Sequence, residues 1–82
     1  MIHCPRLRIR SAAALGATGD HLKVQAHDEG SMRTAGLVLW RQGSRLREFR
    51  PGRLIDVVGS PKRNSNPRYP DDFEVADLRF ID

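Results

Sequence analysis

The sequence of 82 residues predicts an all-β domain in which five short strands close into a small barrel. Five segments alternate polar and apolar residues as strands do, and no segment shows a long helical period. Closing the sheet also removes its edges, which this chain has no helices to cover. Because a chain of this length builds one hydrophobic core, we expect a single domain over residues 1–82.

The first two strands are predicted over about residues 6–15 and 21–28. Arg6–Arg10 and His21–His27 each alternate with a period of two, and the turn signal at residues 18–20 separates them. The alternation predicts these inward-facing side chains: Leu7, Ile9, Leu22, Val24 and Ala26.

The third strand is predicted over about residues 33–40, after a short glycine-containing connection at residues 28–31. Its apolar stretch leaves two arrangements open: either Leu37 and Leu39 face the core and Trp40 lies outside, or the reverse. Gly36 would let another backbone or a ligand approach closely.

Residues 41–53, RQGSRLREFRPGR, place five arginines and one glutamate in thirteen positions. Ser44 can begin a single helical turn that carries Leu46 and Phe49 on one side, and Pro51-Gly52 ends it. We expect this turn to plug one end of the barrel, with its arginines forming a solvated cap or a docking surface.

The last two strands are predicted over about residues 53–59 and 73–81. Ile55, Val57 and Val58 favour a strand that Gly59 closes, and the proline-rich residues 60–72 are expected to form a long loop. In the fifth strand the apolar residues change face, which predicts a bulge near Ala76.

This order of elements matches the five-stranded Greek-key barrel of the OB-fold, which has a short helical turn between strands three and four. The alternative is a small SH3-like barrel. That fold usually places its helical turn between the last two strands, where this chain has a proline-rich loop.

Charge is distributed unevenly along the chain. Residues 1–68 hold thirteen basic and five acidic side chains, a net charge of +8, whereas residues 69–82 hold one and five, a net charge of −4. A basic body with an acidic last segment suggests a polyanion-binding surface from which one strand is excluded.

Several function classes find no support in the sequence. No apolar run could span a bilayer, the N-terminus lacks the apolar core of a signal peptide, and the single Cys4 cannot form an internal disulfide, so we expect a cytoplasmic chain without a membrane partner. Metal ligands are too few for a zinc site, and neither a nucleophile elbow nor a Walker-type loop is present. We expect no cofactor and no catalysis by this chain alone.

Four segments, in this order and spacing, resemble the OB domain of RecJ-type exonucleases of the DHH superfamily: Gly19–Val24, Gly36–Val38, Pro51–Val58 and Phe73–Leu78. The similarity covers roughly residues 7–80 and departs from the family at residues 61–72. It implies an OB domain of an enzyme that degrades single-stranded DNA from the 5′ end. In that family, catalytic domains that precede the OB domain hold Mn or Mg through a DHH motif, which is absent here, so the resemblance implies an excised domain or a stand-alone relative.

OB-folds bind single strands on strands two and three and through the flanking loops, so this geometry selects the candidate nucleic-acid-binding residues. Those expected to contact single-stranded DNA are Lys23, Gln25, Lys62, Arg63, Arg68, Tyr69, Trp40, Arg8 and Arg10. Each has a plainer alternative: a solvated strand face, a solvent-exposed loop, a Trp40 buried in the core, or a strand-one arginine neutralised by Asp56.

The leading functional hypothesis is a single-stranded-DNA-binding domain that positions substrate for a catalytic core not present in this chain. One alternative is a protein-interaction module that docks on DHH-type catalytic domains or on another DNA-repair protein through an apolar patch around Trp40 and Phe49. Another is an RNA-binding OB domain.

Overall fold

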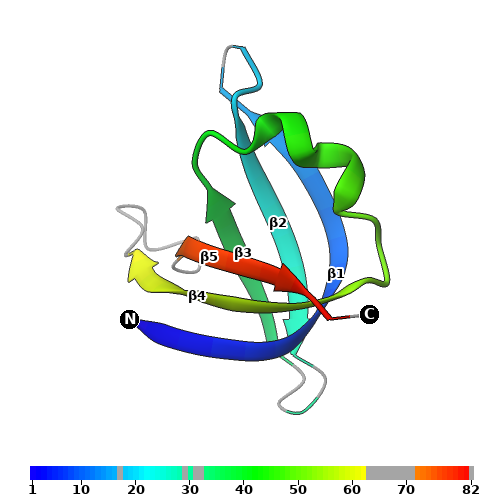
Figure 1. Cartoon of the computed structure of the whole chain (residues 1–82), viewed down its shortest axis with the longest axis vertical. Helices are drawn as coiled ribbons and strands as arrows, with labels where there is room; N and C mark the ends of the chain where they lie inside the picture. The colour runs from blue at the N-terminus through cyan, green and yellow to red at the C-terminus, as the bar shows by residue number, and fades with distance from the viewer. Residues whose placement is uncertain (17, 29, 31–32, 63–71, 82) are drawn as a thin grey trace.

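The computed structural model describes residues 1–16, 18–28, 30, 33–62 and 72–81, and the structural statements below concern these residues. Five strands pair in the order β1-β2-β3-β5-β4 and close into a barrel, with one 3₁₀ helix, η1, between β3 and β4. The bounds are β1 Ile2–Leu15, β2 His21–Asp28, β3 Arg33–Leu39, η1 Gly43–Glu48, β4 Leu54–Lys62 and β5 Asp72–Phe80. In Figure 1, β4 and β5 cross in front of the other strands and η1 lies over one end. The predicted OB-fold is confirmed.

Strand β1 is longer than predicted, because it begins at Ile2 instead of residue 6. Its first part pairs with β4 and its second part with β2, so one strand serves both sides of the barrel. The pairing with β4 shifts between Cys4 and Leu7, where Pro5 lacks an N–H and Arg6 has a φ of 55°. This irregularity lets β1 bend. It also interrupts the polar–apolar alternation, so the sequence pattern does not predict residues 2–4 as part of the strand.

Strand β4 also extends beyond its prediction. Ser60, Pro61 and Lys62 pair with β5, so the segment predicted as a loop from residue 60 begins as strand. Gly59 does not end the strand; it lies directly against the backbone of Glu74, where there is no room for a Cβ atom. The sequence predicts a strand end at this glycine, but in the structure it permits a close approach of two strands.

Strand β5 joins the two halves of the barrel. It pairs parallel with β3 through residues 72–74 and antiparallel with β4 along most of its length. Val58 lies opposite Asp77 and Gly59 opposite Val75, which leaves Ala76 as an extra residue. The predicted bulge at Ala76 is therefore confirmed.

The core is formed by the side chains that the alternation predicted, together with residues of β3, β4 and the segment after η1. The buried cluster is Leu7, Ile9, Leu22, Val24, Ala26, Leu37, Leu39, Phe49, Ile55 and Val57. Of the two arrangements left open for β3, the one with Leu37 and Leu39 inside and Trp40 outside is correct. No helix in the described part of the chain is long and apolar enough to cross a membrane.

One barrel end is closed by a single side chain instead of the two predicted. Phe49 is buried and its ring lies 5.2 Å from that of Phe80, whereas Leu46 is 37% exposed. Within a 3₁₀ helix a spacing of three would place both side chains on one side, but Phe49 lies just after η1 with a φ of −93° and a ψ of 62°, so the helical repeat does not set the direction of its ring. The guanidinium of Arg53 lies 3.8 Å from the Phe80 ring centre and covers the plug from outside.

Candidate nucleic-acid interface

Lys23, predicted to lie on the floor of the binding groove, is on the outer face of β2 and is already paired. Its ammonium group forms an ion pair with the carboxylate of Asp72, the first residue of β5. Both side chains are about three quarters buried. A nucleic-acid phosphate would therefore compete with a carboxylate of the same chain for this lysine.

Gly36 of β3 provides the space in which this ion pair forms. A Cβ atom at Gly36 would lie 2.8 Å from Oδ1 of Asp72 and 3.2 Å from Cε of Lys23. Gly36 also pairs with Gln25 on one side and with Asp72 on the other. The close approach expected at this glycine is thus made by neighbouring side chains, and the half-buried Gln25 lies next to it on the same sheet.

Trp40 directly follows β3 and is 44% exposed. Its ring meets that of His21 edge-on, with 4.9 Å between ring centroids and an interplanar angle of 80°. His21 is itself held in place, because its Nδ1 accepts a hydrogen bond of 2.8 Å from the backbone N–H of Arg41. An indole fixed in this way keeps a large exposed surface without much conformational freedom to lose on binding.

The strand-one arginines differ in their surroundings. Arg8 donates a 2.7 Å hydrogen bond from its guanidinium to the carbonyl of Gly52, which ties β1 to the turn before β4. Arg10 is exposed and lies at a second register shift of β1, between Ile9 and Ser11. Of these two, Arg10 is the one whose location suits a contact at the rim.

Asp56 was expected to neutralise a strand-one arginine, and the structure corrects this. Its Oδ2 pairs with the guanidinium of Arg79 on β5 at 3.0 Å, and its Oδ1 accepts the backbone N–H of Arg6 at 3.0 Å. These hydrogen bonds, from Arg6 first and then from Arg79, lower the pKa of the Asp56 carboxyl. Strand β1 therefore stabilises the Asp56 carboxylate through the backbone N–H of Arg6, not through an arginine side chain. Arg6 has a positive φ of 55° at this position.

Four predicted residues belong to the connection between β4 and β5. Lys62 is the last residue of β4, opposite Asp72 in the ladder. Arg63, Arg68 and Tyr69 lie outside the described residues, so their roles stay predictions.

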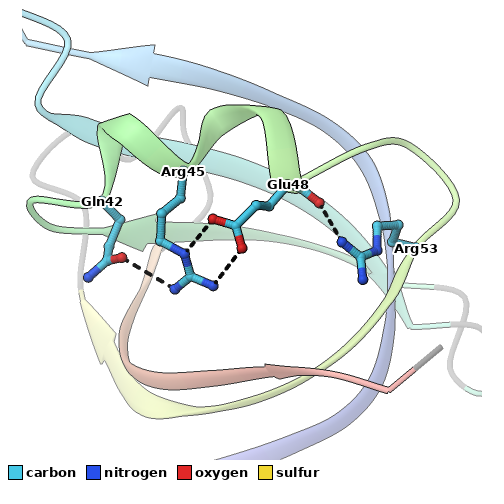
Figure 2. A network of polar contacts seen from close by, with 4 residues as sticks. All are labelled: Gln42, Arg45, Glu48 and Arg53. Carbon is cyan, nitrogen blue, oxygen red and sulfur yellow. Dashed lines mark hydrogen bonds and ion pairs between the residues drawn. The ribbon is translucent and has the colours of Figure 1, made fainter.

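The arginine-rich segment forms a polar network on η1 (Figure 2). Arg45 donates from its guanidinium to both carboxylate oxygens of Glu48, at 3.0 and 3.3 Å, and to Oε1 of Gln42 at 3.3 Å. Arg53 donates to the backbone carbonyl of Glu48 at 3.0 Å. The bond from Arg45 lowers the pKa of Glu48, and in return the carboxylate offsets the charge of Arg45. The three-residue spacing of Arg45 and Glu48 in a helical turn was the available sequence signal.

A cleft beside Trp40 was not anticipated from the sequence. It has a volume of about 170 Å³ and opens where β3 and β5 separate beyond their three paired residues. Gln42 and Asp77 bring polar groups to it, and Trp40 forms part of its wall. Within the described part of the chain, no three His, Cys, Asp or Glu side chains gather as a metal site would need.

A comparison with known protein families matches residues 1–68 to the RecJ OB domain. The match includes β1 to β4 and the helix η1. The chain belongs to the RecJ OB domain family. Comparisons with curated proteins and with solved structures give no match. RecJ OB domains typically bind nucleic acid and are not catalytic by themselves.

Proposed function

We propose that this RecJ OB domain binds single-stranded DNA across the outer face of β2 and β3 and positions it for a RecJ-type 5′–3′ exonuclease core. The observation that carries the proposal is the exposed Trp40, held by His21 at the end of β3. Stacking of a base on an aromatic side chain contributes roughly 1 to 3 kcal/mol per base. Family membership supports the nucleic-acid class of ligand.

The distribution of charge indicates which part of the domain the single-stranded DNA contacts. The net charge of +8 over residues 1–68 favours a polyanion, whereas the −4 over residues 69–82 disfavours phosphate contacts along β5. On this basis the DNA backbone follows β2, Arg10 and the β4–β5 connection, and it avoids the acidic strand.

The direct test is fluorescence anisotropy of a labelled oligo-dT titrated with the 82-residue chain at several salt concentrations. We expect weak binding whose logarithm falls linearly with log salt, with a slope near −0.7 per phosphate contact. An affinity that stays the same from low to high salt would contradict the proposal, because the contacts would then not be with phosphates.

Charge-removing variants on two parts of the chain locate the surface. The triple variant K62Q/R63Q/R68Q should lose more affinity for oligo-dT than the double variant R45Q/R47Q, because Glu48 already offsets the charge of Arg45. Trp40→Ala should weaken binding about tenfold, as the loss of one stacked base predicts. The opposite ranking of the arginine variants would place the groove on η1.

A protein-interaction role is the second candidate. Phe49, expected in its apolar patch, is buried in the core, but Trp40 and Leu46 are exposed near η1 and favour this role. Its partner would be a DHH-type catalytic domain or another DNA-repair protein. NMR titration separates the two: shifts on adding single-stranded DNA support the first proposal, whereas shifts that appear only on adding a RecJ-type catalytic core support the second. Competition between DNA and RNA of the same sequence tests the RNA-binding alternative, since only RNA offers 2′-hydroxyls.

A further inference from the structure

The cleft beside Trp40 owes its existence to the path of β5. Among the described residues, β3 pairs with β5 only from Gly36 to Val38, whereas β5 stays paired with β4 from Asp72 to Phe80 with Ala76 as an extra residue. The chain after β3 continues through Trp40 and Gln42 into η1, so the two segments diverge and leave the cleft of about 170 Å³ between them.

One wall of the cleft is aromatic. Trp40 lines the cleft while its contact with His21 fixes the ring, and the partly buried Leu78 also lines it. A flat aromatic ligand would gain stacking on the indole. Because Trp40 directly follows β3, a strand lying on β2 and β3 can place one of its bases here.

The polar groups of the cleft have defined hydrogen-bonding roles. Oε1 of Gln42 accepts the bond from Arg45, which leaves the Nε2 group of the amide as the donor toward a ligand. Oδ1 of Asp77 accepts the backbone N–H of Leu78 at 2.9 Å, which leaves Oδ2 as an acceptor. The charge of Arg45 is offset by Glu48, so this arginine orients Gln42 instead of attracting a phosphate.

A donor and a carboxylate lining one cleft fit guanine best among the nucleobases. Guanine presents an O6 acceptor next to two adjacent donors, N1–H and the 2-amino group, which one carboxylate can accept together, whereas thymine offers only N3–H beside a carbonyl, and adenine and cytosine offer one amino group beside a ring-nitrogen acceptor. We propose that the cleft formed by Trp40, Gln42 and Asp77 is a guanine-binding subsite, in which the base stacks on Trp40, accepts from Gln42 and donates to Asp77. This inference rests on the proposed function, since it assigns a base preference to the same domain.

The test compares short oligo-dT strands of about nine nucleotides that carry one central guanine, hypoxanthine or adenine. A single guanine should raise affinity about five- to tenfold over oligo-dT, as one bidentate base contact predicts, and hypoxanthine, which lacks the 2-amino group, should raise it less. Asp77→Asn should abolish the guanine preference while oligo-dT affinity is kept. Asp20→Asn is the matched control, because it removes an exposed carboxylate outside the cleft and should preserve the preference.

A second arm uses guanosine and adenosine 5′-monophosphates with ¹⁵N-NMR of the Trp40 indole and the Ala76 amide. If oligo-dT binds but all substituted strands bind equally, the subsite is wrong and the proposed function stands. If no oligonucleotide binds but the guanosine nucleotide alone gives saturable shifts that Asp77→Asn removes, the subsite stands and the proposed function is wrong. If neither arm shows binding, both are overturned.

Discussion

The ammonium group of Lys23 lies on the carboxylate of Asp72, above the bare Cα of Gly36, and so joins β2 to β5 across β3. The two residues are 49 positions apart in the sequence. This ion pair ties together three strands on the face proposed to bind DNA, and it sets the charge that this face presents.

Removing the carboxylate should strengthen DNA binding. Asp72→Asn removes the ion-pair partner of Lys23, which can then bind a DNA phosphate. We therefore expect oligo-dT affinity to rise about two- to fivefold, and the slope of log affinity against log salt to steepen by about 0.7. Lys23→Gln should then cost more affinity in the Asp72→Asn background than in the wild type. A double-mutant cycle measured by anisotropy gives this coupling, and equal effects of Lys23→Gln in both backgrounds would show that the ion pair does not limit binding.

Two strand glycines should respond differently to alanine. At Gly36 the new methyl group meets the ends of two flexible side chains, so Gly36→Ala should separate Lys23 from Asp72 and cost under about 1 kcal/mol. At Gly59 it meets the backbone of β5, which cannot move without opening the barrel, so the cost should reach about 2 kcal/mol or more. Urea unfolding of both variants measures this difference, and a larger loss at Gly36 would refute the assignment.

The barrel plug should depend on one side chain. Phe49→Ala removes a buried ring that contacts Phe80, and we expect it to lower the free energy of unfolding by about 3 to 5 kcal/mol. Leu46→Ala, on the exposed side of η1, should cost under about 1 kcal/mol. Thermal unfolding followed by circular dichroism compares them, and similar losses would mean that Leu46 is also part of the plug.

Asp56 should give the domain a pH-dependent part of its stability. Its pKa is lowered from the ordinary value of 3.8, so the ionised form stabilises the folded state above that pH, and the contribution is lost as pH falls through the lowered pKa. Asp56→Asn should therefore destabilise most near neutral pH and least in strong acid.

Chemical denaturation at several pH values between 7 and 2 would measure this change. Arg79→Gln, which removes the second of the two hydrogen-bond donors, should reproduce only part of the effect. A stability difference between wild type and Asp56→Asn that is constant across the range would contradict the assignment.

Much of the fold was predictable because it follows from local patterns. The alternation in β1 and β2 identified Leu7, Ile9, Leu22, Val24 and Ala26 as core residues, and a change of face identified the bulge at Ala76. The strand ends were harder to predict. Gly59 and Pro61 are local signals for the end of a strand, but β4 continues past both because its residues pair with β5.

The candidate site was only partly predictable. The alternation of β2 placed Lys23 correctly on the outer face, whereas the apolar run of β3 left the side of Trp40 open, and the structure places it outside. The ion pair of Lys23 with Asp72, and the presence of Gln42 and Asp77 in the wall of one cleft, depend on which strands become neighbours, and no local pattern encodes that.

Because Ala76 is an extra residue in β5, the number of residues in this strand determines whether the bulge next to the cleft forms. Deleting Ala76 would remove the bulge and leave Phe73, Val75, Leu78 and Phe80 in regular alternation, so that these side chains would still face the barrel while β5 would run along β4 without its irregularity. Relatives that differ by one residue here would keep the same barrel but lose the recess next to Trp40. The number of residues in the strand that corresponds to β5, Asp72–Phe80, would then distinguish family members that can hold a base in this cleft from those that cannot.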